Sequence, residues 1–200
     1  MLKLKPLFLI AALAITSIFS AANADSDDIF PINLKNTTGD QITIQPQEDE
    51  ITVLEWFNKG CPFVKKFYKS GHMQFLQGKY KSENVKWYSI NSTKAGHGDY
   101  IAEDQRVDLS EELKFQNTET LYDEDGKVGQ RVGAKTTPHV FIFKGENLIY
   151  SGAVDDAPDS DSDPKDADNH IENVLTALAK GEDVSVKKTR PYGCSVKYAE

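Results

Sequence analysis

Cys61 and Cys194 are the residues of this 200-residue chain best suited to covalent chemistry. Cys61 follows a strand-like segment and a break at 58–60, and it precedes a segment with helical spacing. At the first turn of a helix, unpaired backbone N–H groups and the positive end of the helix dipole favour a thiolate. Pro62 fits such a turn because its missing N–H would have no partner there. The sequence therefore predicts a reactive thiol at Cys61, with a buried structural cysteine as the alternative.

The elements that must position these thiols follow from the hydrophobic pattern. β-Branched and aromatic residues over 51–57 predict a strand, and helical spacing begins at Pro62, with Gly71 as a candidate interruption. Further strands are predicted over 42–44, 85–90, 120–122, 139–144 and 148–154, and helices over 108–115, 128–132 and 171–178, the last capped by Gly181. This order predicts an α/β fold in which helices pack on a mixed sheet through right-handed crossovers.

Thr137 and Pro138 directly precede one predicted strand. Local sequence favours a trans bond between them, since only a small minority of X–Pro bonds are cis. A cis bond would instead present the backbone of Thr137 beside the active thiol, where an incoming chain can pair with it. His139, the next residue, is expected to be a half-exposed strand residue.

The first 24 residues have the pattern of a secretory signal peptide. A basic start is followed by an apolar run from Leu7 to Phe19 and by the small-x-small site that ends at Ala24. The run is too short to favour a membrane span, and an uncleaved anchor is the alternative. We therefore expect a signal peptide over 1–24 and one domain over 25–200, with a tail over 182–200. Cleavage near Ala24 would leave a periplasmic or extracellular protein without stable membrane insertion.

Two segments carry a resemblance to a known family. Residues 55–65, Glu-Trp-Phe-Asn-Lys-Gly-Cys-Pro-Phe-Val-Lys, and residues 137–143, Thr-Pro-His-Val-Phe-Ile-Phe, resemble the thioredoxin superfamily. Within it, the chain is similar to the peroxiredoxin-like (AhpC/TSA-type redoxin) branch, which ends in Gly-Cys-x-x-Lys-aromatic, here 193–198. The resemblance covers 51–198. It implies a thioredoxin-like fold, a central mixed β-sheet flanked by helices, with a C-terminal tail.

The chain also departs from the family's patterns. Val64 stands where a dithiol thioredoxin has its second cysteine, and Asn58 and Leu54 replace the usual peroxiredoxin Thr or Ser and Pro. The resemblance therefore implies the fold without a standard peroxide pocket. Cys194 is left as the intramolecular partner of Cys61, either in a redox cycle or in a permanent disulfide.

Three further residues are candidates for supporting roles. Glu55 is either a buried proton carrier of the kind that many thioredoxin-like proteins use, or a solvent-facing residue. Asn58 can donate a hydrogen bond to an oxidised sulfur, or is a solvated turn residue. Lys65, with Lys66 on the outer face of the predicted helix, adds positive charge near Cys61.

Composition excludes several other functions. The formal charge of −8 argues against binding to nucleic acid, which requires a concentrated basic surface. The four histidines show no metal-ligand spacing, no CxxC motif suggests zinc, and the acidic segment 155–168 lacks the EF-hand pattern. No metal or organic cofactor is implied.

The sequence thus predicts an exported thiol–disulfide oxidoreductase with Cys61 as the nucleophile, Cys194 as the resolving or partner thiol, and Thr137–Pro138 as the substrate-side backbone. Its substrates would be protein thiols or disulfides, and an unidentified electron donor would complete the cycle. One alternative is an antioxidant thiol peroxidase that takes peroxide as its substrate. The other is a non-enzymatic binding module in which Cys61 and Cys194 form a structural disulfide.

Overall fold

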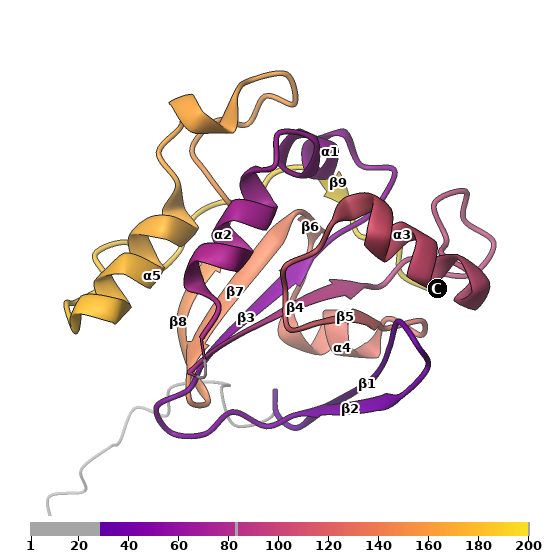
Figure 1. Cartoon of the computed structure of the whole chain (residues 1–200), viewed down its shortest axis with the longest axis horizontal. Coiled ribbons are helices and arrows are strands. Elements are labelled where there is room, and N and C mark those ends of the chain that lie inside the picture. The colour runs from indigo at the N-terminus through magenta and orange to yellow at the C-terminus, as the bar shows by residue number, and fades with distance from the viewer. Residues whose placement is uncertain (1–28, 83, 200) are drawn as a thin grey trace, which may run out of the picture.

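The computed structural model describes residues 29–82 and 84–199, so the predicted signal peptide over 1–24 lies outside the described residues. A seven-stranded mixed sheet forms the centre of the fold, in the order β2-β1-β5-β4-β3-β7-β8 (Figure 1). Its strands are β1 (Ile32–Asn36), β2 (Gln41–Ile44), β3 (Ile51–Trp56), β4 (Val85–Asn91), β5 (Glu119–Tyr122), β7 (His139–Lys144) and β8 (Asn147–Gly152). Strand β4 runs parallel to both β3 and β5, and the other neighbouring pairs are antiparallel.

Helices cover both faces of this sheet (Figure 1). One face packs against α1 (Pro62–Lys69), α2 (His72–Tyr80), α3 (Arg106–Leu113) and α5 (His170–Lys180), and the other packs against α4 (Lys127–Val132). Two short 3₁₀ helices, η1 (Glu103–Gln105) and η2 (Pro164–Asp166), lie in the connections. The predicted α/β class and the mixed sheet flanked by helices are confirmed.

Strand β3 shows how the alternating pattern builds both cores. Val53 contributes to the core under α1, α2, α3 and α5, whereas Leu54 and Trp56 contribute to the core under α4. Successive side chains of a strand point to opposite faces of its sheet, so Glu55 faces the same side as Val53. This placement puts a carboxyl group inside the core that also contains Cys61.

Glycines end two of the helices as predicted. Gly71 has a φ of 75° and separates α1 from α2, and Gly181 has a φ of 69° and caps the end of α5. A left-handed residue at these positions is strained unless it is glycine. Strand β1 was not predicted, and neither was the short β9 (Cys194–Ser195), which pairs with β6 (Thr136–Thr137) apart from the main sheet.

Candidate functional site

Cys61 occupies the N-cap position of α1, at the end of the turn that leaves β3. Only 2% of the residue is exposed, and its backbone carbonyl accepts from the N–H of Lys65 at 3.0 Å. Pro62 is the first helical residue, as the sequence predicts. The thiol therefore lies where the unpaired N–H groups of the helix converge.

Asn58 shapes this turn from inside it. Its side-chain oxygen accepts from the N–H of Gly60 at 2.7 Å, and its amide donates to the hydroxyl of Thr93 at 3.0 Å. Its carbonyl also accepts from the N–H of Cys61 at 3.1 Å. Asn58 is buried, so the expectation of a solvated turn residue is wrong.

Thr137 is the first residue that the fold brings to Cys61 from a distant part of the chain. The Cys61 thiol donates to the carbonyl oxygen of Thr137, with 3.0 Å between sulfur and oxygen. The bond between Thr137 and Pro138 is cis, so the trans form that local sequence favours is wrong here.

Cys194 is the second residue brought to Cys61, and it arrives on the C-terminal tail. In the antiparallel pair of β6 and β9, Thr137 lies opposite Cys194 and Thr136 lies opposite Ser195. Both are free thiols in the structure, and the Cys194 thiol lies close enough to Cys61 to affect its pKa. The tail thus pairs with the backbone of Thr137, where an incoming chain was expected to pair.

Close backbone approach explains the glycine before this cysteine. Gly193 has a φ of 128°, and a Cβ atom placed on it would lie 2.1 Å from the carbonyl oxygen of Thr137. A side chain at this position is therefore excluded by contact as well as by conformation. Gly193 allows Cys194 to lie directly against β6.

Beyond Cys194, the tail is fixed by a docking site for Tyr198. The Tyr198 hydroxyl donates to the carbonyl of Ala134 at 2.8 Å. Cβ atoms on Gly126 and Gly129 would lie 2.7 and 2.5 Å from atoms of the Tyr198 ring and hydroxyl, so both glycines make room for this side chain. The carbonyl of Lys197 also accepts from the backbone N–H of Lys94 at 2.8 Å. The tail is therefore anchored on the far side of the cysteine.

The two thiols differ in acidity. Burial raises the pKa of Cys61, but hydrogen bonds from the Cys194 thiol, from Thr137 and from backbone N–H groups outweigh it and hold the pKa below its usual value. Burial, the hydrogen bond to Cys61 and the charge of Cys61 together raise the pKa of Cys194 to about 11. Proton loss therefore occurs first at Cys61.

Glu55 lies at the centre of a buried polar cluster. One carboxylate oxygen accepts from the hydroxyl of Tyr68 at 2.8 Å, and the other accepts from the indole of Trp87 at 2.8 Å and the hydroxyl of Ser89 at 3.0 Å. Burial raises the pKa of Glu55 despite these hydrogen bonds. Glu55 is buried, so the alternative of a solvent-facing residue is wrong.

His139 is buried rather than half-exposed. Its Nδ1 accepts from the backbone N–H of Lys135 at 3.2 Å. Burial, with the positive charges of Lys135 and Lys188, lowers its pKa to about 4. A neutral imidazole therefore follows the Thr137–Pro138 bond.

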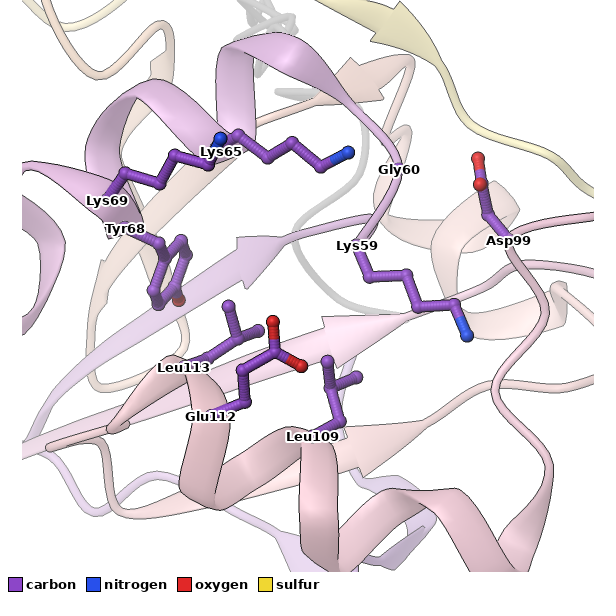
Figure 2. Close-up of a pocket in the computed structure, with 9 residues that line it drawn as sticks. All are labelled: Lys59, Gly60, Lys65, Tyr68, Lys69, Asp99, Leu109, Glu112 and Leu113. Carbon is purple, nitrogen blue, oxygen red and sulfur yellow. The ribbon is translucent and has the colours of Figure 1, made fainter.

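Lys65 lines a cavity of about 400 Å³ that extends to Gly60, the residue before Cys61. Figure 2 shows Lys59, Lys65 and Lys69 on the side formed by the turn and α1, and Glu112 with two leucines on the side formed by α3. The residues that line it are Lys59, Gly60, Lys65, Tyr68, Lys69, Asp99, Leu109, Glu112 and Leu113. We call this space the lysine cavity.

Lys66, the next residue, points the other way and is buried, contrary to the expectation of an outward lysine. Its ammonium group lies 3.2 Å from the carboxylate of Asp155. The described ranges contain no cluster of His, Cys, Asp and Glu suited to a metal ion. Within the same ranges, no helix combines the length and apolar character needed to cross a bilayer.

Comparison with known proteins shows the fold. An uncharacterized conserved protein from Geobacillus kaustophilus is 27% identical, with a TM-score of 0.73 over 86% of this chain and 90% of that one. A hypothetical protein from Sinorhizobium meliloti is 20% identical, with the same TM-score over 86% and 92%. A thioredoxin-like protein from Aeropyrum pernix is 14% identical, with a TM-score of 0.52 over 76% and 89%. No protein-family model and no curated protein matches the chain. The chain has a thioredoxin-like fold.

Proposed function

We propose that this protein is a thiol–disulfide oxidoreductase in which Cys61 is the nucleophile and Cys194 is the resolving thiol. The observation that carries the proposal is the position of Cys194 opposite Thr137, whose carbonyl accepts from the Cys61 thiol, combined with a pKa that is lowered at Cys61 and raised at Cys194. A pair with this asymmetry loses its first proton at Cys61 and keeps Cys194 protonated to higher pH.

The reaction balances as two exchanges. The Cys61 thiolate attacks one sulfur of a substrate disulfide, forms a mixed disulfide and releases the first substrate thiolate. Cys194 then loses its proton to solvent and attacks the Cys61 sulfur, which releases the second substrate thiolate. The substrate is reduced by two electrons, and the protein now holds a Cys61–Cys194 disulfide. An external dithiol of the electron donor returns the protein to its reduced form.

The docked tail supports fast resolution but covers the nucleophile. Cys61 is almost fully buried while Cys194 lies against Thr137. The ladder of β6 and β9 is two residues long, so local opening there breaks few backbone hydrogen bonds. We therefore assign Thr137 and Pro138 a positioning role: they hold Cys194 ready until the tail opens for a substrate disulfide.

The proposal has two further parts. We propose Glu55 as the proton store of the site, because its buried carboxyl group has a raised pKa. We also propose export with cleavage near Ala24, from the signal-peptide pattern over 1–24. Mass determination of the mature N-terminus after expression in a bacterium with a periplasm tests the export step.

The redox function is tested by mixing reduced protein with 2-hydroxyethyl disulfide, and separately with hydrogen peroxide. We expect the disulfide to give an intramolecular Cys61–Cys194 bond, Cys194→Ser to accumulate the mixed disulfide at Cys61, and Cys61→Ser to remain unreacted at neutral pH. Rapid oxidation by peroxide with slow disulfide exchange would instead identify a peroxidase. A pair inert to both oxidants would leave the binding-module alternative standing.

A further inference from the structure

The lysine cavity places positive charge beside the reactive turn of a protein whose overall charge is strongly negative. Three of its lining residues are lysines, and the formal charge of the chain is −8. Lys65 is four residues after Cys61 on α1, and Lys59 is two residues before it. None of the three lysines forms an ion pair with another residue in the described ranges. Their ammonium groups are therefore available to an anion.

The two carboxylates of the cavity do not cancel this charge. Asp99 packs against Gly60, where a Cβ atom would lie 2.0 Å from its oxygen, and it lies 3.8 Å from the Nδ1 of His97. Glu112 stands on the opposite wall, on α3 (Figure 2). Three ammonium groups against two carboxylates leave the lining with an excess of positive charge.

The floor of the cavity is apolar. Tyr68 is buried with its hydroxyl directed to Glu55, which leaves its ring to the cavity, and Leu109 and Leu113 contribute aliphatic surface from α3. A volume of about 400 Å³ is within the range of pockets that hold small molecules. An apolar floor with a cationic rim suits a small aliphatic molecule that carries carboxylates.

The position of the tail favours a small molecule over a protein strand. Cys194 pairs with Thr137, so the backbone edge that a peptide would use is already occupied. The lysine cavity lies on the Gly60 side of Cys61 and leaves that edge untouched. A small disulfide held there makes no use of that edge, so Cys194 can pair with Thr137 again while half of the substrate is still bonded to Cys61.

We propose that the lysine cavity binds the carboxylates of low-molecular-weight disulfides and directs their sulfur atoms to Cys61. This inference rests on the proposed function, since it names the substrate class of the same two thiols. The exchange is the one described above: the small disulfide is reduced to two thiolates, and the Cys61–Cys194 disulfide forms. The acidic protein as a whole repels such anions, so a preference for them has to arise locally.

Three aliphatic disulfides of opposite and zero charge test the proposal. Reduced protein is mixed with 3,3′-dithiodipropionate (anionic), 2-hydroxyethyl disulfide (neutral) or cystamine (cationic), and formation of the Cys61–Cys194 bond is followed. We expect the anionic disulfide to react fastest and the cationic one slowest. Each substitution among Lys59→Gln, Lys65→Gln and Lys69→Gln should lower the anionic-to-neutral rate ratio about two- to threefold, the size of an exposed charge pair. Raised ionic strength should lower it too.

The ratio removes any effect of the lysines on the thiol itself, because a change in the pKa of Cys61 alters both rates alike. Lys144→Gln is the matched control, since register places Lys144 opposite Ile51, at the other end of β3 from Cys61. It should leave the ratio unchanged. Equal rates for the three disulfides, or a ratio unchanged in the triple variant, would overturn the cavity assignment alone. Failure of the neutral disulfide to oxidise the thiols would overturn the proposed function, and the inference with it.

Discussion

The Lys66 ammonium and the Asp155 carboxylate form a buried ion pair of 3.2 Å, in which the two side chains are 1% and 0% exposed. Lys66 also donates to the carbonyl of Ala157 at 2.7 Å, and the hydroxyl of Tyr192 donates to Asp155. Lys66 belongs to α1, which Cys61 caps, and Tyr192 precedes Cys194 by two residues. The ion pair therefore ties together the two segments that carry the thiols.

Removing one partner of this pair should be costly. Lys66→Met leaves the Asp155 carboxylate buried without its counter-charge, which we expect to lower the free energy of unfolding by about 3 to 5 kcal/mol. Combining it with Asp155→Leu should recover much of the loss, because no uncompensated charge remains. Urea unfolding of the single and double variants measures both effects. Lys65→Met, at the exposed neighbouring position, should change stability by no more than about 0.5 kcal/mol; an equal loss there would refute the role of the ion pair.

Release of the tail should change two rates in opposite directions. Tyr198→Ala removes the ring from its site at Gly126 and Gly129 and the hydrogen bond to Ala134. Cys61 should then be alkylated faster, because its cover opens more often. The Cys61–Cys194 disulfide should close more slowly, by about tenfold for each 1.4 kcal/mol of docking free energy lost. Tyr198→Phe keeps the ring and should show a smaller change in both rates.

The thiol of Cys194 should set the acidity of Cys61. Cys194→Ala removes a hydrogen bond that favours the Cys61 thiolate, so the pKa of Cys61 should rise. Cys194→Ser retains a donor at the same position and should raise it less. The pH dependence of alkylation at Cys61, followed by mass spectrometry, measures the pKa in each variant. Indistinguishable profiles in the three proteins would show that the tail covers the thiol without tuning it.

His139 should make the protein sensitive to acid. Its pKa is about 4 in the folded chain, against about 6.5 when unfolded. Between these values the unfolded state binds more protons, so stability is complete above about pH 6.5 and falls as the pH drops toward 4. The expected loss is roughly 3 kcal/mol. His139→Asn keeps an acceptor for the N–H of Lys135 and should remove this part of the slope in urea unfolding at a series of pH values.

Glu55 should affect the pH dependence of stability in the opposite direction to His139. Burial raises its pKa in the folded chain, so the folded state holds a proton that the unfolded state releases above about pH 4.3. This contribution to stability is present at low pH and is lost as the pH rises through the raised value. Glu55→Gln lacks it, so the variant should gain stability relative to the wild type from pH 4 to pH 8. If the difference in the free energy of unfolding between the variant and the wild type were constant over that range, Glu55 would not be the group that holds the proton.

Local pattern was enough to predict the turn that carries Cys61. The strand over 51–57, the break after it and Pro62 define the position of Cys61, and the structure places it at the start of α1 as expected. Strand β1 carried a readable signal that was missed, since Ile32 and Leu34 alternate with polar residues and are buried.

The remaining features depend on partners that are distant in sequence. Lys66 is buried because Asp155 supplies the opposite charge, and helical spacing alone places such a lysine outward. Strand β9 consists of two residues and exists through its pairing with β6, so it has no periodicity to detect. Gly126 and Gly129 were one sequence signal for the docked tail. Two glycines in and beside a short helix indicate that another group packs closely there, and in the structure that group is Tyr198.

The dependence of β9 on β6 also sets the order in which the two cysteines are brought together. Protein synthesis runs from the amino end to the carboxyl end, so every strand of the main sheet is made before Cys194. Cys61 can thus fold into place while its partner is still inside the ribosome, or not yet translated. The nascent domain carries an unmatched thiol, and under the proposed function the redox couple forms when the tail emerges and docks.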